Sequence, residues 1–455
     1  MLPLLAFRPE SGGEPEMVRE SQRRRGADVS VVDRIIKLDA VWRAAQLRAD
    51  SCRKELAGAK RALSSLRKGT GHADATAPTP SPESLRELGC RVGEAEAAEG
   101  EAHHQLQEVL RTVGNLVHEH VPLAPDDTRA VRGEAFALRR LLAAGFAEKV
   151  DATATSRAGW RPTGVGLLAV HALLTHALGF VARRSFALLP TPLTPTADRA
   201  AKFGKFCRAR GDGDMLADGR AVADSLGDHP LGALHATAWL QPSQLPLRYA
   251  YLRRRWPCAR GRGSGGERGL QLVGWDGDVE LCVCEVHTDD GSCWDGLEAL
   301  AAEAEALHLE LDMRPQLRDV STVQLAPENA RTLELLVPHA GPGLPPGKDE
   351  GGEVLAVGDE VEPAQAAPTK AAPTPVGDDS QISLGRISCQ VDFLSRQFGV
   401  RCELKQMGER SKRHVHSVGG TLFDPVAALL ALVASAPDDV TIAQALPETV
   451  RRSFD

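Results

Sequence analysis

The sequence predicts an α+β protein in which a long antiparallel helical hairpin precedes a body of helices and strands. Apolar or small residues recur at alternating spacings of three and four from Ile35 to Leu66, and again from Leu85 to Leu116. This spacing is typical of a coiled-coil seam rather than the wider apolar stripe of a globular helix. Farther along, residues 165–181 show a helical apolar pattern, and residues 183–192 indicate a strand that ends at prolines. A chain of 455 residues is too long for one compact core, so two or three domains are expected.

The two helices of the hairpin are separated by residues 68–82, a run rich in Gly and Pro. Such a run cannot continue a helix and gives the chain room to reverse. Within the second helix only Glu99 interrupts the seam. We therefore expect a hairpin over about residues 31–116, roughly 50 Å long at about 1.5 Å per residue.

Charge is distributed unevenly over the hairpin, although the net charge of the chain is −7. A negative total argues against nucleic-acid binding by the whole surface. The first helix is basic and the second is acidic, so one interpretation is electrostatic pairing across the seam. A second interpretation is that the basic helix follows a phosphate backbone, and the two do not exclude each other. The candidate RNA-binding residues are Arg48, Arg53, Lys54, Lys60, Arg61, Arg67 and Lys68.

Composition argues against several classes of protein. Charged residues make up 25% and hydrophobic residues 42%, which is ordinary for a soluble globular protein. No apolar run reaches the roughly eighteen residues that span a membrane, and the first residues lack the long apolar stretch of a secretory signal. The nine cysteines are scattered, and Cys282 and Cys284 are too close for the usual zinc ligands. We expect a reducing, cytoplasmic location, free thiols and no membrane partner.

Short motifs around the hairpin carry a resemblance to a known family. They are Phe7-Arg8, Gly12-Gly13, Val18-Arg-Glu-Ser21, Val32-Asp33, Leu38-Asp39, Val41-Trp-Arg43 and the closing run Gly114-Asn-Leu-Val-His-Glu-His-Val-Pro122. Together they closely resemble the N-terminal arm of seryl-tRNA synthetases of the eukaryotic type. In that family the arm is an antiparallel coiled coil that binds tRNA and recognises its long variable arm by shape and backbone. The resemblance implies a tRNA-binding domain over residues 1–122.

The resemblance returns after residues 123–158, which are expected to be a linker region. Residues 165–192 resemble motif 1 of class II synthetases, a helix and strand that form the dimer interface, with Pro192 as the motif proline. Residues 230–250 resemble the segment that leads into motif 2. Three later stretches also resemble the family, and they are residues 329–335, 389–396 and 446–454.

This second part of the resemblance implies a class II core over residues 159–455, an antiparallel β-sheet flanked by helices. The core is interrupted at residues 341–379, which are rich in Pro, Gly, Ala and acidic residues. That composition indicates a disordered insertion.

The groups that activate serine in the family are missing from the matching positions. There, a motif 2 arginine clamps the α-phosphate of ATP, a glutamate reads adenine, a phenylalanine stacks on it, and a motif 3 arginine holds the γ-phosphate. An ungapped alignment puts Pro257, Ala259 and Gln271 at the first three positions and Ala427 at the fourth. A shifted frame that makes Arg255 the clamp leaves Pro257 at the glutamate position, so no register restores the pair.

Two further positions match the family poorly. Ser383 stands where a magnesium-binding glutamate is expected, and only Asp228 keeps its charge type in the serine-recognising segment. Each missing charged interaction is worth about 1.5–3 kcal/mol. One missing transition-state donor costs about 10²–10³ in rate. The combined absences predict that adenylation does not occur.

Other candidate sites in the sequence are weaker. Residues 261–267 are rich in glycine but lack the lysine and the strand-to-helix context of a phosphate-binding loop, and they fit a motif 2 loop better. His103, His104, His414 and His416 have no cysteine or carboxylate at ligand spacing, so they are expected to be solvated or core histidines.

The sequence thus favours a catalytically inactive relative of seryl-tRNA synthetases. Its expected partners are tRNA or another structured RNA, together with a second copy or a class II synthetase subunit in a dimer. One alternative is a functional serine–tRNA ligase that uses displaced residues, and only this alternative calls for ATP and magnesium as cofactors. Another alternative is a purely structural dimer partner that binds no RNA.

Overall fold

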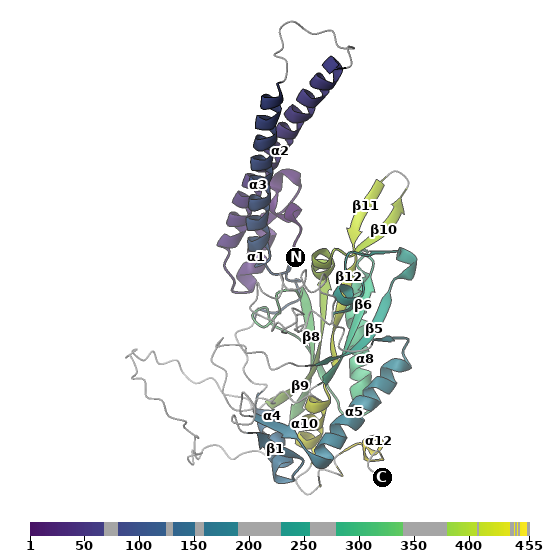
Figure 1. Cartoon of the computed structure of the whole chain (residues 1–455). Coiled ribbons are helices and arrows are strands. Elements are labelled where there is room, and N and C mark those ends of the chain that lie inside the picture. Colours follow the sequence, from purple (N-terminus) through teal and green to yellow (C-terminus); the bar gives the residue numbers. More distant parts are fainter. Residues whose placement is uncertain are drawn as a thin grey trace, which may run out of the picture.

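The computed structural model describes residues 1–67, 81–123, 131–150, 159–189, 229–254, 279–339, 380–406, 409–436, 441, 444 and 446–452. The chain forms a helical arm and a body built on a β-sheet. In Figure 1 the arm projects away from the sheet at the top of the view, and the helices that cover the sheet lie below and beside it.

The arm consists of two long helices, α2 (Ser30–Arg67) and α3 (Pro82–Leu110), preceded by η1 (Leu4–Phe7), η2 (Pro9–Ser11) and α1 (Pro15–Arg24). Ser81 caps the start of α3 by accepting a hydrogen bond from the Ser84 amide, and Pro82 occupies the first helical position. α3 ends at Leu110, earlier than the predicted Leu116, because the following residues leave the helix and dock on the body.

The packing between α2 and α3 follows the predicted seam. Ala49, Cys52 and Ala95 form a small buried cluster midway along the arm. Nearer the body, Ile35 and Leu106 are fully buried and belong to a second core, which continues into the sheet through residues such as Cys282. The arm is therefore packed onto the body at its base, and farther out its two helices pack against each other.

The body contains a seven-stranded sheet in the order β3-β5-β6-β12-β9-β8-β7. In that order the strands are β3 (Ala187–Leu189), β5 (Leu247–Arg254), β6 (Val279–His287), β12 (His416–Phe423), β9 (Ser380–Val391), β8 (Arg331–His339) and β7 (Gln316–Asp319). Every neighbouring pair is antiparallel except β3–β5, which is parallel. The predicted antiparallel sheet is thus confirmed in its centre, and its β3 edge is the exception.

Helices cover one face of this sheet and bury the main core against it. They are α4 (Val131–Ala143), α5 (Gly164–Ala182), α8 (Ser292–Leu309) and α10 (Pro425–Ser435). α4 and strand β1 (Ala147–Val150) fall in the stretch expected to be a linker, and β1 pairs with β2 (Gly159–Pro162). Side chains of α4 such as Leu141 are fully buried in the main core, so these residues are part of the body.

The expectation that no segment is long and apolar enough to cross a membrane was wrong for α5. Among the described helices it alone has that length and composition. Its buried side chains, including Leu173, Ala177 and Phe180, nevertheless pack in the main core of the body. This packing is that of a core helix.

A smaller sheet in the order β11-β10-β4 lies beside the large one. Its strands are β4 (Trp239–Leu240), β10 (Arg401–Gln406) and β11 (Glu409–His414). The β10–β11 hairpin extends toward the same end of the molecule as the arm (Figure 1). Short helices α7 (Pro230–Ala233), η4 (Pro242–Gln244), α9 (Phe393–Phe398) and α12 (Glu448–Arg451) complete the described body.

Candidate functional site

A pocket opens on the sheet face opposite the covering helices, and we call it the core pocket. Strands β5, β8, β9 and β12 line it, together with His229 and the segment 320–329. Its wall includes Tyr251, Arg253, Asn329, Arg386, Gln390 and Thr421. We therefore describe the side chains of this pocket one by one.

Arg253 enters the core pocket from β5 but is held by a carboxylate. Its Nε donates to Glu280 Oε1 at 2.6 Å, and its Nη2 donates to Thr421 Oγ1 at 3.0 Å. The Thr421 hydroxyl in turn donates to Glu280 Oε2 at 2.7 Å. Burial acts to lower the pKa of Arg253, but the nearby Cys282 and Glu280 raise it above its usual value. The positive charge is therefore permanent and already neutralised by Glu280.

Arg386, on β9, is neutralised in the same way by Glu334 of β8. The Arg386 Nε donates to Glu334 Oε1 at 2.8 Å, and Ser383 Oγ donates to the same oxygen at 2.7 Å. Arg318 Nη2 donates to the other carboxylate oxygen at 3.2 Å. Burial acts to raise the pKa of Glu334, but Arg386, Ser383 and Arg318 hold it below its usual value. Ser383, the expected metal position, thus serves as a hydrogen-bond donor to a neighbouring carboxylate.

The base of the core pocket is polar and uncharged. Asn329 Nδ2 donates to Ser388 Oγ at 2.9 Å, and Gln390 Nε2 donates to Asn329 Oδ1 at 3.3 Å. Ser417 Oγ donates to Gln390 Oε1 at 3.1 Å. His229 stands beside this network, and burial together with the charge of Arg253 lowers its pKa to about 4. A neutral imidazole and paired amides offer hydrogen bonds but no free positive charge.

Ala427, at the predicted motif 3 position, lies on α10. Ala427 is 8% exposed and packs in the main core rather than lining the core pocket. Asp424 caps the helix by accepting from the amides of Val426 and Ala427, each at 3.0 Å. The predicted positions Pro192, Asp228, Pro257, Ala259 and Gln271 lie outside the described residues.

The predicted RNA-binding residues of α2 that the structure describes differ in whether they pair with carboxylates. Arg53 donates to Glu96 at 2.8 Å and to Glu99 at 3.1 Å on α3, and to Asp50 at 2.7 Å on its own helix. The pairing interpretation therefore holds for this residue, and Arg91 pairs with Glu55 in the opposite direction at 3.3 Å.

The remaining cations of the arm differ from Arg53 in their surroundings. Arg48, Lys54, Lys60 and Arg61 are exposed side chains of α2. Lys54 and Arg61 are separated by one heptad, which places both on the side of α2 away from α3. Of the two distal residues, the Arg67 side chain and all of Lys68 lie outside what the structure describes. The assignment of these cations to RNA binding stays a prediction.

The base of the arm is fixed to the wall of the core pocket. Asn115 Nδ2 donates to the carbonyls of Gln390 at 2.8 Å and Glu328 at 2.9 Å. Arg25 Nη2 donates to the carbonyl of Asn329 at 2.6 Å. Because Gln390, Glu328 and Asn329 all line the core pocket, the arm and the pocket share residues.

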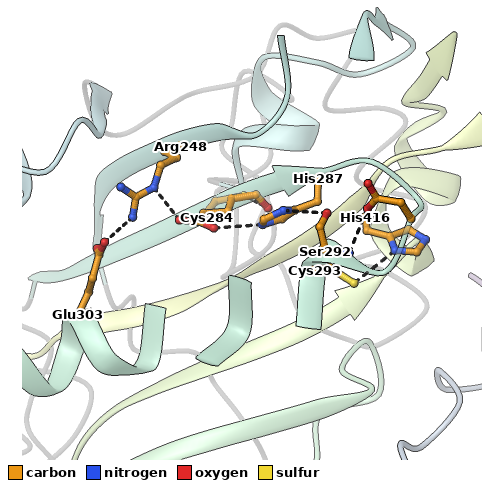
Figure 2. A network of polar contacts seen from close by, with 9 residues as sticks. Arg248, Cys284, His287, Ser292, Cys293, Glu303 and His416 are labelled. Atoms are coloured by element: carbon orange, nitrogen blue, oxygen red, sulfur yellow. Dashed lines mark hydrogen bonds and ion pairs between the residues drawn. The ribbon is translucent and has the colours of Figure 1, made fainter. Parts of the chain in front are cut away.

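A polar network behind β6 was not found by sequence reasoning (Figure 2). Arg248 donates to Glu303 at 2.7 Å and to Glu285 at 2.6 Å, and His287 Nε2 lies 3.0 Å from the second Glu285 oxygen. Burial acts to raise the pKa of Glu285, but hydrogen bonds from His287 and Arg248 lower it. Arg248 belongs to β5, so these contacts join strands β5 and β6 to α8.

The same view shows a contact between Cys293 and His416, with the Cys293 Sγ 3.3 Å from the His416 Nδ1 (Figure 2). His416 was expected to be a solvated or core histidine because no cysteine or carboxylate lies at ligand spacing in the sequence, and the structure places it half-buried beside a cysteine that is distant in the sequence. The two residues are 123 positions apart, so no spacing in the sequence signals their contact. Within the described part of the chain, no group of three or more His, Cys, Asp or Glu residues is arranged to hold a metal ion.

Comparisons with known proteins agree with this fold. Residues 1–117 match the seryl-tRNA synthetase N-terminal domain. The chain is 28% identical to a serine–tRNA ligase of Helianthus annuus over 93% of this chain and 90% of that protein. It is 25% identical to the cytoplasmic serine–tRNA ligase of Schizosaccharomyces pombe, over 98% of this chain and 94% of that protein.

Two solved structures share the fold over nearly the whole chain. One is the cytoplasmic serine–tRNA ligase of Naegleria fowleri in complex with AMP, with a TM-score of 0.68 and 18% identity over 100% of this chain and 97% of that one. The other is the seryl-tRNA synthetase of Pyrococcus horikoshii complexed with ATP, with a TM-score of 0.70 and 17% identity over 96% of this chain and 95% of that one. At these identities the likeness establishes the fold.

Proposed function

Because the chain belongs to the seryl-tRNA synthetase family, we propose that it is a member that has lost serine activation and has kept RNA binding through its arm. The observation that carries this proposal is the pairing of Arg253 with Glu280 in the core pocket. Activation of an amino acid by ATP develops negative charge on phosphate oxygens, which fixed cations must stabilise. An arginine already neutralised by a buried carboxylate is poorly suited to that work.

The second arginine of the pocket leads to the same conclusion. Arg386 is paired with Glu334, and Ser383 donates to this carboxylate in place of a metal-binding glutamate. Ala427 supplies a methyl group to the main core where the family has a phosphate-binding arginine. The described pocket therefore combines two internal ion pairs with a neutral polar base, which is unfavourable for a triphosphate and its magnesium ion.

The arm supports RNA binding through its exposed cations. A stripe formed by Lys54 and Arg61, flanked by Lys60, leaves positive charge on the outside of α2. Contacts of this kind hold the phosphate backbone without reading bases, and they release counterions on binding. The proposed ligand is tRNA or another structured RNA.

A dimer is part of the proposal, either with a second copy or with a class II synthetase subunit. The supporting feature is the apolar outer side of α5, where Val165 and Leu168 are exposed, together with the exposed Leu188 on β3 at the edge of the sheet. These exposed apolar side chains are available for contact with another protein. They belong to the segment that resembles the dimer-forming motif 1.

Two other functions remain to be separated from this proposal. A functional serine–tRNA ligase is favoured by the similarity to serine–tRNA ligases over more than nine-tenths of the chain. A structural dimer partner without RNA binding is favoured by the pairing of Arg53 with Glu96 and Glu99, which uses arm charge internally.

Retention of labelled RNA on a filter tests the proposal for the arm. Reversal of Lys60, Arg61, Arg67 and Lys68 to glutamate should lower retention of total tRNA and flatten its salt dependence, by a slope of about 0.7–0.9 for each phosphate that the arm no longer neutralises. The matched control reverses four cations of the body, Arg139, Lys149, Arg314 and Arg451, with the same change in net charge. Equal retention by both variants and the unchanged chain would favour the structural dimer partner. A serine-dependent exchange assay, designed below, tests the loss of activation.

A further inference from the structure

Trp239, on β4, presents its indole ring to solvent. It is 47% exposed, and it is the only aromatic residue among the exposed large hydrophobic residues of the described chain. The next residue, Leu240, is 6% exposed and packs in the second core. Because successive side chains of a strand point to opposite faces, β4 buries Leu240 and turns Trp239 outward. The hydrophobic cores of the described chain do not use this ring, and neither does the proposed function.

The guanidinium of Arg401 lies over this indole. Its Cζ is 5.3 Å from the centroid of the Trp239 ring, which is within the range of a cation–π contact. The two residues are also partners in the parallel pairing of β10 with β4, so the strands set their relative position. Arg401 Nε is buried and has no hydrogen-bond partner in the described part of the chain. Unlike Arg253 and Arg386, Arg401 is not paired with a described carboxylate, and its positive charge stays available beside the ring.

The backbone around Trp239 is fixed by hydrogen bonds to neighbouring segments. The Thr237 amide donates to the carbonyl of Phe398 at 2.8 Å, and the Arg401 amide donates to the carbonyl of Ala238 at 3.0 Å. Thr237 has a φ of 65°. A β-branched residue adopts this left-handed conformation only where the surrounding structure enforces it. The indole and the guanidinium are therefore presented as a preformed pair.

The residues that follow Trp239 on the surface are polar. Gln241, Ser243 and Gln244 are exposed, and the short helix η4 to which they belong or lead lies beside β10. A site for an apolar protein partner is a contiguous apolar patch, whereas this surface combines one aromatic ring with a cation and amides. A nucleobase matches it, because a base stacks on an indole or a guanidinium plane and offers polar edges to neighbouring side chains.

We propose that Trp239 and Arg401 form a stacking platform for an unpaired base of the RNA that the arm binds. This inference rests on the proposed RNA binding and extends it from phosphates to a base. The hairpin β10–β11, whose first strand pairs with β4, extends toward the same end of the molecule as the arm, so one folded RNA faces both surfaces (Figure 1). Stacking tolerates every base, since each has a π-face. The platform therefore selects unpaired over paired nucleotides and does not read a sequence.

Salt distinguishes the platform from the cations of the arm. Contacts between the arm and phosphates release counterions, so their contribution to affinity falls as salt increases. Stacking on Trp239 neutralises no phosphate, so it adds affinity without changing the slope of affinity against salt. Loss of the indole and loss of the arm charges therefore have different signatures in the same retention assay.

Filter retention of two RNA stem-loops by the full chain tests the platform. Their stems are identical, but one ends in a base pair and the other carries a short unpaired tail. The tailed stem-loop should bind about tenfold more tightly, and Trp239→Ala should abolish this preference without changing the salt slope. Trp239→Phe should keep most of the preference, because a phenyl ring still stacks. The control Leu309→Ala, which truncates a residue on α8 that is 49% exposed, should leave the preference unchanged.

Photocrosslinking of the unchanged chain locates the tail directly. A thiouridine placed in the tail should join to the peptide that contains Trp239 or to the one that contains Arg401, as read by mass spectrometry. Arg401→Gln should weaken binding of the tailed stem-loop and leave binding of the other stem-loop unchanged. Because the crosslink is formed on the unchanged chain, a variant that fails to fold does not remove the test.

Equal retention of the two stem-loops, with crosslinks that exclude both peptides, would overturn the platform and leave RNA binding by the arm intact. Preference for the tail that survives reversal of the arm cations, with an unchanged salt slope, would support the platform and contradict the proposed role of the arm. A chain that retained neither RNA would contradict both. Loss of a dimer by Trp239→Ala in light scattering, with RNA retention unchanged, would assign the indole to a contact between copies and overturn the platform.

Discussion

Asn115 at the base of the arm donates from Nδ2 to the carbonyl of Gln390 at 2.8 Å. Gln390 is a residue of β9 whose side chain lines the core pocket and bonds to Asn329 and Ser417. A single side chain of the arm is therefore hydrogen-bonded to the strand that forms the pocket wall. This contact fixes the base of the arm relative to the core pocket.

Asn115→Ala is expected to destabilise the full chain by about 1–3 kcal/mol, because it leaves the carbonyls of Gln390 and Glu328 without their donor. Asn115 is 4% exposed, so water does not readily replace the amide. Urea denaturation followed by circular dichroism measures the change. Gln105→Ala, which removes an exposed amide on α3, is the control and should change stability little. Equal stability of the two variants would contradict the role assigned to Asn115.

Arg253→Met is expected to lower the free energy of unfolding by about 3–5 kcal/mol, because it leaves Glu280 as a buried carboxylate without this cation. The double variant Arg253→Met with Glu280→Leu should be more stable than Arg253→Met alone, since it removes both charges. Denaturation of the two variants in parallel gives the comparison. If Arg253→Met left the free energy of unfolding unchanged, Arg253 and Glu280 would not form the internal ion pair on which the proposed loss of activation depends.

His308→Leu is expected to raise stability and to reduce its dependence on pH. His308 is fully buried, burial lowers its pKa to about 4, and its Nε2 has no hydrogen-bond partner among the described residues. Because the folded-state pKa lies below the unfolded value of about 6.5, the unfolded chain takes up the proton first, and stability falls as the pH decreases from about 6.5 to 4.

Thermal unfolding of His308→Leu at pH 7 and pH 5 checks this prediction. One histidine contributes a slope of at most about 1.4 kcal/mol per pH unit in that window. His229, whose pKa is also lowered to about 4, should keep part of the dependence in the variant. An unchanged difference between the two pH values would show that His308 is not the neutral buried group described here.

Arg61→Gln is expected to weaken RNA retention more than Arg53→Gln. Arg53 is bound to Glu96 and Glu99 of α3, whereas Arg61 contacts a backbone carbonyl of its own helix, that of Ala57, at 3.2 Å. A cation without a carboxylate partner is the better ligand for phosphate. The salt dependence of retention should fall for Arg61→Gln by a slope of about 0.7–0.9 and remain nearly unchanged for Arg53→Gln. The reverse order would contradict this assignment of the arm charges.

The sequence predicted the parts of the fold that depend on local periodicity. The heptad spacing from Ile35 onward predicted α2 and α3, because this pattern depends only on residues that are close in the sequence. The end of α3 at Leu110 was not predicted, since Asn115 leaves the helical path to bind carbonyls of residues more than two hundred positions away. Tertiary contacts of this kind are invisible to periodicity.

The candidate site shows the same division. The resemblance predicted which catalytic positions are replaced. The described structure adds that Ser383 donates a hydrogen bond to Glu334 and that Ala427 packs in the main core. The resemblance could not indicate that Glu280 and Glu334 neutralise the arginines of the pocket, because each pair joins different strands. Pro257, Ala259, Gln271, Asp228 and Pro192 lie outside the described residues, so their assignments stay predictions.

Serine-dependent exchange of pyrophosphate into ATP by the full chain tests the central claim most directly. The cytoplasmic serine–tRNA ligase of Arabidopsis thaliana, 29% identical over 74% of this chain, is assayed alongside as the positive control. Our account predicts exchange by this chain no higher with serine than without it, in a preparation that retains RNA on a filter. Clear serine-dependent exchange would contradict the account and identify the protein as a working ligase that uses displaced residues.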